Sequence, residues 1–356
     1  MLAIAQATEL GGAEYSLLRN ARLLPGHGFR VEIAVPGEGR LADSAREAGI
    51  VVHHLPVGKL PAGRWAGAAL GLPRARRLAR AIAPDLVWLN GTVAGRLAPA
   101  LTSHTLVPQL HDFPPRAPRP WRSARFWRAA PVVMCDSKAV ADVAESMGAP
   151  ADRLRVVYVP AGPPGPAPEP AWAGDGPIVG FVGRIEPRKA PLELLRAFGR
   201  VLERLPQARL ALVGEDELGA SGEYADAVSS LAAGLGDRVL MLGRVPDASR
   251  LMPWFDVLCM PSNEEALGAV AIEALAAGTP VVATDSGGPR EFVADGVNGA
   301  LVPVGDERAL AEALVTTLAS ADAMTEAARR SAEPFTAERV AERVAAALRE
   351  ALEARS

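Results

Sequence analysis

The segment PIVGFVGRIEPRKAPLELLRAFGRVLERLPQARLALVG (177–214) decides the fold. It begins with the apolar run PIVGFVG, ends with the apolar run ARLALVG, and has an amphipathic stretch at 191–204 between them. A short apolar run bounded by Gly or Pro is typical of a buried strand, and the spacing of apolar residues in the middle stretch is typical of a helix. Strand, helix and strand in this order predict a βαβ unit in a parallel sheet.

The same alternation continues on both sides of this unit. Four more apolar runs follow it, and seven precede it, from LAIAQ near the start to RVVYVP just before a proline-rich segment. Helical stretches separate these runs at 222–234, 247–253 and 267–277 in the second half, and at 13–27, 41–48 and 137–148 in the first half. The tail from residue 307 is predicted to be helical almost to its end, with a break near Pro334.

A Pro- and Gly-rich segment divides the two series of strands. It is too rich in these residues for a helix or a central strand, so we predict an interdomain linker at 161–176. The predicted fold is α/β, with two Rossmann-like doubly wound domains that face each other across a cleft, at 1–160 and 177–333. A C-terminal helix at 334–356 can pack back on the N-terminal domain. In open α/β sheets, ligands bind beyond the carboxyl ends of the strands.

Composition excludes several classes of protein. The chain has 356 residues, 49% of them hydrophobic and 22% charged, which fits two globular domains. Its two cysteines, Cys135 and Cys259, lie in apolar runs, so we expect buried, reduced thiols and a cytoplasmic protein. The five histidines lack metal-ligand spacing with the cysteines, so no metal site is expected. Neither a basic leader nor a run of ~20 apolar residues occurs, and we expect no signal peptide or membrane span.

Charge is unevenly distributed along the chain. Residues 1–160 contain 20 Lys and Arg against 12 Asp and Glu, a net charge of +8, whereas the remaining residues contain 18 against 29. Arginines are mixed with Trp65 at 63–80 and with Trp121, Phe126 and Trp127 at 116–131, which suits an anionic membrane surface or a lipid-linked phosphate acceptor. The alternative is solvated helix faces with the aromatic rings turned into the core. Nucleic acid fits the charge, but no recognition module is present, so we expect none as a partner.

Two glutamates stand out in SNEEALGAVAIEALAAGTPVVATDSGGPRE (262–291). Seven residues separate Glu265, in the loop after a predicted strand, from Glu273, inside the helix predicted from Leu267. The first turn of a helix presents unpaired N–H groups that suit a phosphate. Glu265 could then bind a sugar on one side of a diphosphate, and Glu273 a ribose on the other, because a carboxylate accepts hydrogen bonds from vicinal hydroxyls. The alternative is that both are exposed glutamates, which are favourable at a helix start.

Two cations follow the first strand of the second domain. In GFVGRIEPRKAP (180–191), Arg184 and Lys189 emerge at the carboxyl end of that strand. Such a pair suits a diphosphate, since Arg binds two oxygens at once and Lys supplies a mobile point charge. Their effect is largest in the transition state, when negative charge grows on a departing nucleoside diphosphate. The alternative is a solvated basic loop.

Together with GGAEYSLLRNARLLPGHGFRVEIAVP (11–36), these two motifs resemble the family-4 retaining glycosyltransferases of GT-B fold, in the same order and along nearly the whole chain. The resemblance implies transfer of a hexose from a nucleotide diphosphate sugar to an acceptor hydroxyl, with retention at the anomeric carbon and without metal or cofactor. Glycolipid, polysaccharide and small-molecule acceptors stay open, and so does peripheral attachment to the inner face of the membrane. A nucleotide-sugar epimerase of the same fold and a non-catalytic sugar-nucleotide binder are the alternatives.

The resemblance also implies roles for individual residues. Arg184 and Lys189 would bind the diphosphate, Glu265 the donor sugar and Glu273 the ribose, while His111 would face the donor sugar. Glu265, Arg184, Lys189 and His111 are the expected catalytic groups, although His111 is not expected to be a general base, because the departing phosphate can take the acceptor proton. The alternative for His111, a lone histidine after a strand, is a structural role. Further donor contacts are expected from Leu267, Gly268 and Ala269, from Gly243, Arg244 and Val245 near the base, and from Gly11 and Gly12.

Three positions depart from the family pattern. Ala266-Leu267-Gly268 stands where Gly-Phe-Gly is frequent, Lys189-Ala190 where Lys-Gly is common, and Glu215-Asp216-Glu217 where a glycine-rich turn is usual. The first two changes preserve the backbone contacts. The third places acidic residues beside the expected nucleotide site.

Overall fold

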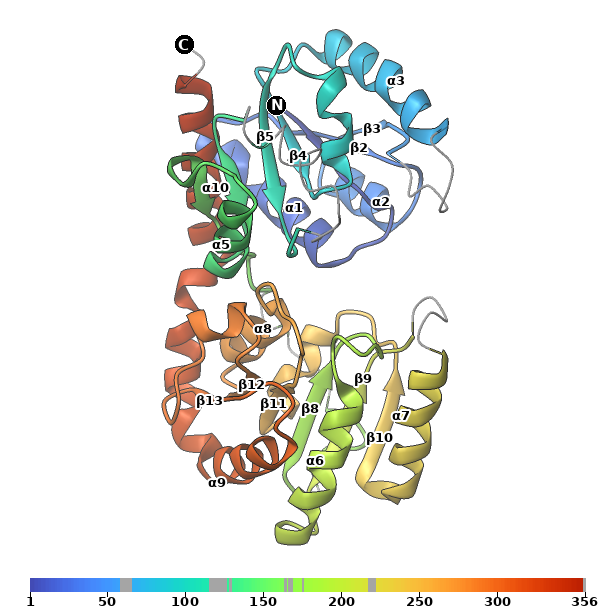
Figure 1. The fold of residues 1–356 in the computed structure, drawn as a ribbon, viewed down its shortest axis with the longest axis vertical. Helices are drawn as coiled ribbons and strands as arrows, with labels where there is room; N and C mark the ends of the chain where they lie inside the picture. Colours follow the sequence, from blue (N-terminus) through green and yellow to red (C-terminus); the bar gives the residue numbers. More distant parts are fainter. Residues whose placement is uncertain are drawn as a thin grey trace. The chain divides into compact units, whose positions relative to one another are not determined.

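The computed structural model divides into two compact units, each built on one parallel sheet (Figure 1). Unit 1 comprises Met1–Pro160 with Phe335–Ser356, and unit 2 comprises Ala161–Pro334. The structure describes residues 1–57, 66–114, 127, 130–162, 165, 169–174, 176–216 and 222–354, without the side chains of 66–70.

The sheet of unit 1 has the strand order β3-β2-β1-β4-β5-β6-β7 over the described residues. Its strands are β1 (Leu2–Ile4), β2 (Glu32–Val35), β3 (Val51–His54), β4 (Leu86–Asn90), β5 (Thr105–Leu110), β6 (Val133–Cys135) and β7 (Leu154–Val156). The helices are α1 (Gly12–Leu23), α2 (Arg40–Glu47), α3 (Ala66–Ile82), α5 (Lys138–Ser146) and α10 (Ala337–Glu353), with short 3₁₀ turns η1 (Leu24–His27), η2 (Ala94–Ala100) and η3 (Ala151–Arg153).

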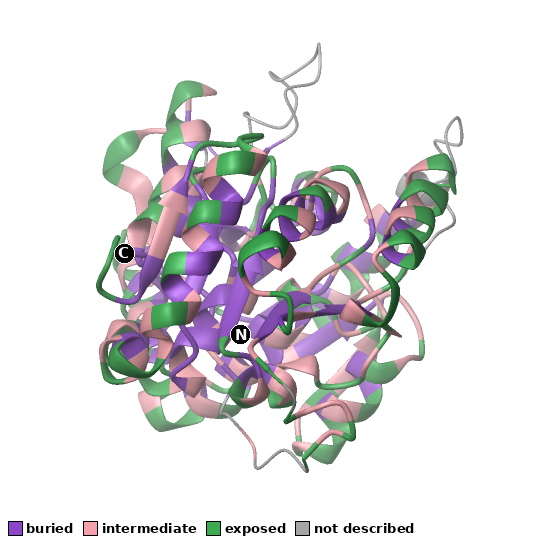
Figure 2. Cartoon of the chain, turned by 90° about the horizontal axis from the view of Figure 1, so that it is seen from below, coloured by how far each residue is buried: buried purple, intermediate pink, exposed green. Residues whose placement is uncertain are grey.

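Alternate strand side chains of unit 1 build a core on each face of the sheet. In β1, Ala3 joins the cluster formed with α1, α2 and α10, while Leu2 and Ile4 join the cluster formed with α3 and η2. Figure 2 shows the buried strands between helices whose outer faces are exposed. Helices cover both faces of this sheet, and in open α/β sheets of this kind ligands bind beyond the carboxyl ends of the strands.

Helix α10 belongs to the core of unit 1 although it lies at the far end of the sequence. Val340, Val344 and Leu348 are fully buried in the cluster with α1 and α2. Arg155 donates through Nε to Glu350 (2.8 Å), which ties the end of the sheet to this helix. The chain therefore returns to unit 1 after it has completed unit 2.

The sheet of unit 2 has the strand order β10-β9-β8-β11-β12-β13. Its strands are β8 (Ile178–Val182), β9 (Arg209–Val213), β10 (Val239–Gly243), β11 (Val257–Met260), β12 (Val281–Thr284) and β13 (Gly299–Val302). The helices are α6 (Pro191–Arg204), α7 (Gly222–Gly234), α8 (Ala269–Ala277) and α9 (Glu307–Ala332), with 3₁₀ turns η4 (Gly236–Arg238), η5 (Ala248–Trp254), η6 (Gly288–Glu291) and η7 (Glu333–Phe335). One face of the sheet packs on α6, α7 and α9.

The prediction of two parallel-sheet α/β domains is confirmed, and the differences are local. The stretch 13–27 divides into α1 and η1, because Pro25 opens a tighter turn, and 247–253 is the 3₁₀ turn η5, with Pro253 inside it. At the end of the Pro- and Gly-rich segment, Trp172 stacks on Phe255 with ring centroids 6.0 Å apart. This end of the segment is therefore part of unit 2.

Candidate functional site

The loops after β8 and β11 meet at the carboxyl edge of the unit 2 sheet. These strands are neighbours, so their ends emerge side by side. Asn263 of the β11 loop donates from its backbone N–H to the Arg188 carbonyl (2.8 Å) and from Nδ2 to the Pro187 carbonyl (2.8 Å). Two motifs that lie far apart in sequence are thereby joined.

An ion pair links the two loops at their centre. Lys189 Nζ lies 2.6 Å from Glu265 Oε2, and the two side chains are 19% and 8% exposed. Ser262 Oγ donates to the same oxygen at 3.0 Å, and Thr284 Oγ1 donates to the Ser262 carbonyl at 2.5 Å. Oε2 of Glu265 thus accepts from both Lys189 and Ser262. Among the described residues, this leaves Oε1 available to accept from another group.

The loop after β12 fixes the backbone of Glu265. The Glu265 N–H donates to the Ser286 carbonyl (3.1 Å), and the Gly288 N–H donates to the Glu265 carbonyl (2.9 Å). A Cβ at Gly288 would collide with the backbone of Leu267, so only glycine permits this close approach. Three strand-end loops therefore set the direction of one carboxylate.

Helix α8 begins two residues later than the sequence predicts. Gly268 is its N-cap, in the left-handed region with φ 93°, and its carbonyl accepts from Ala271 (2.9 Å) and Ile272 (3.2 Å). The first-turn N–H groups of Ala269 and Val270 have no partner inside the helix. Glu273 is the fifth helical residue, about 6 Å along the axis from the first.

Arg184 lies in the same loop as Lys189 but has a different partner. Its guanidinium pairs with Glu186 (2.9 Å), whose carboxylate also accepts from Arg188 Nε (3.2 Å). The Arg184 side chain is 44% exposed. The structure thus joins Lys189 to Glu265 directly and leaves Arg184 on the surface of the β8 loop.

The residues expected near the base lie at the same edge of the sheet. Gly243 ends β10 with φ 62°, and its carbonyl accepts from the Gly214 N–H at 2.8 Å. Arg244 is exposed and Val245 half-buried. In the strand order, β10 is three strands from β11, which at about 4.8 Å per strand is roughly 14 Å.

In unit 1, His111 sits between side chains from two neighbouring strands. It follows β5 and lies 2.7 Å through Nδ1 from Asp136, which follows β6. Through Nε2 it lies 2.7 Å from Asn90, the last residue of β4. Asn90 Nδ2 donates to the Ala13 carbonyl (3.3 Å) in the first turn of α1, which begins at Gly12 with Gly11 as N-cap.

Sequence reasoning missed Asn90 and Asp136. Their positions in the sequence could have indicated a site, because Asn90 ends the apolar run PDLVWLN and Asp136 follows the apolar run PVVMC. Polar residues in these places lie at the carboxyl ends of neighbouring strands. Recognising them as partners of His111 required the strand order β4-β5-β6.

Electrostatics favour a charged ring at His111. Burial opposes protonation of the imidazole, but the charge and hydrogen bond of Asp136 act the other way, with further contributions from Glu14 and Asp112. The pKa of His111 is therefore raised above its ordinary value. By contrast, burial raises the pKa of the Cys135 and Cys259 thiols, which stay neutral and inert.

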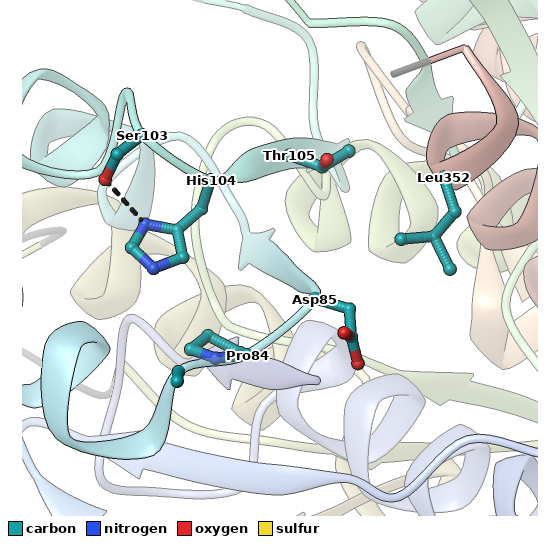
Figure 3. Close-up of a pocket in the computed structure, with 7 residues that line it drawn as sticks. Pro84, Asp85, Ser103, His104, Thr105 and Leu352 are labelled. Carbon is teal, nitrogen blue, oxygen red and sulfur yellow. Dashed lines mark hydrogen bonds between the residues drawn. The ribbon is translucent and has the colours of Figure 1, made fainter. Parts of the chain in front are cut away.

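A hollow of about 400 Å³ lies at the opposite edge of the unit 1 sheet (Figure 3). Asp85, just before β4, and Thr105, the first residue of β5, line it together with Leu352 of α10. His104, also in its wall, pairs with its neighbour Ser103 (3.1 Å). Because this hollow is at the amino ends of the strands, it is separate from the edge where open α/β sheets bind ligands.

The basic stretches of unit 1 are only partly described. Arg74, Arg76, Arg77 and Arg80 are exposed on α3. Trp127 is fully buried, so this ring belongs to the core and is not available to a membrane. The other arginines and aromatic residues of these stretches lie outside the described residues: Arg64, Trp65, Arg116, Arg119, Trp121, Arg122, Arg125, Phe126 and Arg128.

Membrane-spanning helices and metal-binding clusters are both absent from the described residues. None of the helices there combines the length and apolar character needed to cross a membrane. No group of three or more His, Cys, Asp or Glu side chains in that part of the chain is arranged to hold a metal ion.

Comparison with known families accounts for most of the chain. Residues 10–161 match the family described as Glycosyltransferase Family 4, and residues 176–320 match Glycosyl transferases group 1. The D-inositol 3-phosphate glycosyltransferase of Xylanimonas cellulosilytica is 33% identical over 373 residues, covering 87% of this chain and 84% of that protein. The lipopolysaccharide core biosynthesis glycosyltransferase LpsE of Rhizobium meliloti is 30% identical, covering 73% of each.

Other relatives match over a shorter span. The D-inositol 3-phosphate glycosyltransferase of Kribbella flavida is 41% identical over 189 residues, which are 50% of this chain and 45% of that enzyme. The protein of the same name from Frankia alni is 36% identical. That match covers 64% of this chain and 63% of the Frankia protein.

Solved structures agree on the fold. Anabaena Alr3699/HepE in complex with UDP-glucose superimposes with a TM-score of 0.84 at 24% identity, over 98% of each chain. WaaG, a glycosyltransferase involved in lipopolysaccharide biosynthesis, gives a TM-score of 0.74 at 19% identity, over 97% of this chain and 98% of WaaG. The chain therefore belongs to the family 4 glycosyltransferases and has the two-domain GT-B fold.

Proposed function

We propose that the protein transfers a hexose from a nucleotide diphosphate sugar to an acceptor hydroxyl, with retention at the anomeric carbon and without a metal ion. The contact between Lys189 and Glu265 carries this proposal, because it places a cation and a carboxylate together beside the start of α8. The complexes of HepE with UDP and with UDP-glucose, in a protein of the same fold, support a nucleotide-sugar donor.

The diphosphate binds between the β8 loop and α8. Lys189 and Arg184 supply positive charge, and the N–H groups of Ala269 and Val270, which have no partner inside α8, donate to phosphate oxygens. When the glycosidic bond breaks, negative charge grows on the departing phosphate, and groups already aimed at it lower the barrier. In this proposal the two cations and the helix N–H groups neutralise the diphosphate without a metal ion.

The two glutamates bind hydroxyl groups on either side of the diphosphate. Glu265 accepts from a donor-sugar hydroxyl through Oε1, since Oε2 is already held by Lys189 and Ser262. Glu273 accepts from the ribose, and the base lies toward Gly243, Arg244 and Val245. The departing phosphate takes the proton of the acceptor hydroxyl as that hydroxyl attacks from the same face, which retains the anomeric configuration.

The acceptor binds to unit 1 and carries a phosphate or a lipid-linked phosphate. The net charge of +8 over residues 1–160 favours an anionic acceptor. Similar proteins carry the names D-inositol 3-phosphate glycosyltransferase and phosphatidyl-myo-inositol mannosyltransferase, and both names include a phosphate-bearing compound.

A donor panel tests this function. Purified protein is given UDP-, GDP- and ADP-hexoses in buffer with EDTA, with and without inositol phosphate, and the release of nucleoside diphosphate is followed. We expect release from one of the donors that increases with acceptor, and a product whose anomeric proton coupling matches that of the donor. A new nucleotide sugar without release would indicate an epimerase, and binding with neither reaction would indicate a non-catalytic binder.

The exposed arginines of α3 predict salt-sensitive attachment to anionic vesicles. Each cationic side chain near an anionic surface contributes about 1 kcal/mol, so the double variant Arg76→Gln/Arg77→Gln should bind phosphatidylglycerol vesicles about 30-fold more weakly. The control Arg200→Gln/Arg204→Gln removes two exposed charges from α6 of unit 2 and should bind as the wild type does. Flotation that is independent of anionic lipid, or equal for both variants, would remove membrane attachment through α3.

A further inference from the structure

A buried chain of hydrogen bonds in unit 1 has a fixed direction. It begins at Trp88, whose indole N–H can only donate, and which donates to Gln109 Oε1 (3.0 Å). The Gln109 amide is thereby oriented, and its Nε2 donates to Asp136 Oδ1 (2.7 Å). Trp88 and Gln109 are fully buried, so water does not compete for these groups. Asp136 Oδ1 therefore accepts the hydrogen bond from Gln109.

The other end of the chain is oriented by the backbone of α1. Asn90 Nδ2 donates to the Ala13 carbonyl at 3.3 Å, which turns Asn90 Oδ1 toward His111. The reversed amide would set two carbonyl oxygens against each other. Asn90 is therefore an acceptor toward His111.

His111 thus lies between two acceptors. Its Nδ1 is 2.7 Å from Asp136 Oδ2, and its Nε2 is 2.7 Å from Asn90 Oδ1. A neutral imidazole has only one N–H, so it satisfies one of these contacts and opposes a nitrogen lone pair to the other oxygen. Only the doubly protonated ring satisfies both.

We propose that Asp136 and Asn90 are positioning residues for the transfer reaction, which hold His111 as a fixed cation and tie it to the first turn of α1. This rests on the proposed function. In this arrangement His111 is no general base, and both of its N–H groups are occupied by protein atoms. Its contribution is a positive charge held at the carboxyl edge of the unit 1 sheet, where an anionic group of a substrate can approach the Gly11–Gly12 turn.

The network joins four elements at this edge. Asn90 comes from β4, His111 from the end of β5, Asp136 from the end of β6, and Ala13 from α1. The other charged groups that act on the ring are Glu14, on α1, and Asp112, next to His111. Both are acidic, and together with Asp136 they favour the charged ring against the desolvation that burial imposes.

The substitution Asp136→Asn removes the charge of the side chain while it keeps nearly the same size and shape. The new carboxamide can accept from Gln109 through its oxygen and donate to His111 Nδ1 through its nitrogen. The ring then keeps Nε2–H toward Asn90 and becomes neutral. Every hydrogen bond has a counterpart in this variant, and only the two charges are lost.

Histidine ring protonation tests the assignment without turnover, which separates it from a failure of the proposed function. In the full-length protein labelled with ¹⁵N-histidine, and with His111→Gln to identify the signals, we expect both His111 nitrogens to carry protons at about pH 6.5, where an ordinary histidine is about half protonated. One proton should be lost only as the pH rises through the raised pKa, above about 6.5. In Asp136→Asn one nitrogen should be unprotonated. A wild-type His111 ring that is no more protonated than an ordinary histidine at about pH 6.5 would overturn the proposal.

Kinetics supply the second measurement. Asp136→Asn should lower kcat on the order of tenfold or more, while the Kd for the nucleoside diphosphate, bound by unit 2, is unchanged. Asp142→Asn, the same substitution at an exposed position of α5, should behave as the wild type. Wild-type kcat in Asp136→Asn would contradict a role in positioning. If that variant does not fold, Asn90→Asp keeps the ring charged but removes the donor to Ala13, and wild-type kcat there would equally contradict it.

Discussion

Replacement of Arg184 by alanine is expected to lower kcat/KM for transfer by on the order of 100-fold or more. In the proposed function the guanidinium faces the charge that develops on the departing diphosphate, and loss of one such preorganised donor costs about 10²–10³ in rate. Because Arg184 is 44% exposed and its ion pair with Glu186 lies at the surface, the stability cost should stay below about 1 kcal/mol. The measurement is steady-state kinetics together with a thermal melt.

Arg188→Ala is the matched control for Arg184. It removes one positive charge from the same loop, as Arg184→Ala does. Arg188 also has the same partner, because its Nε donates to the Glu186 carboxylate at 3.2 Å. We expect its kcat/KM within a few-fold of the wild type. Equal losses in both variants would show that the loop contributes only its overall charge, and wild-type rates in Arg184→Ala would remove Arg184 from the site.

Glu265→Gln is expected to reduce kcat by about 100-fold with the fold intact. The amide is nearly isosteric, but it replaces the carboxylate that pairs with Lys189 at 2.6 Å and accepts from Ser262 at 3.0 Å. Lys189 then loses its charged partner, and in the proposed function the sugar hydroxyl loses a charged acceptor, which is about twice as strong as a neutral one. Both effects bear on the transition state more than on ground-state binding.

Glu264→Gln is the control one residue away. Glu264 is exposed, whereas Glu265 is buried. Comparison of the two variants therefore distinguishes a carboxylate with a specific contact from the overall negative charge of the loop. The control should retain wild-type kcat. If both variants lose activity equally, or if Glu265→Gln alone stays fully active, Glu265 does not contact the sugar.

Much of the architecture could be predicted because each strand of both sheets is a short apolar run bounded by Gly, Pro or polar residues. The details that escaped prediction depend on backbone conformation. Gly268 adopts φ 93° and delays the start of α8 to Ala269, which moves the free N–H groups along the chain. A sequence pattern identifies a helix but not the residue at which a left-handed glycine opens it.

The sequence predicts which segments form the candidate site, but it does not predict which of their side chains are in contact. The β8 loop and the β11 loop could each be recognised from Lys189 and Glu265, but their meeting depends on β11 lying next to β8, after a crossover past two other strands. The same holds for His111, whose partners Asn90 and Asp136 lie 21 and 25 residues away. Strand order, which arises from the packing of helices on the sheets, brings these groups together.

A crystal structure of the full chain with a bound nucleoside diphosphate would locate the pyrophosphate directly. We expect its oxygens within hydrogen-bond distance of Lys189 Nζ, the Arg184 guanidinium and the N–H groups of Ala269 and Val270, with the ribose against Glu273. A pyrophosphate elsewhere, with the Lys189–Glu265 pair and the start of α8 untouched, would contradict the assignment of the donor site.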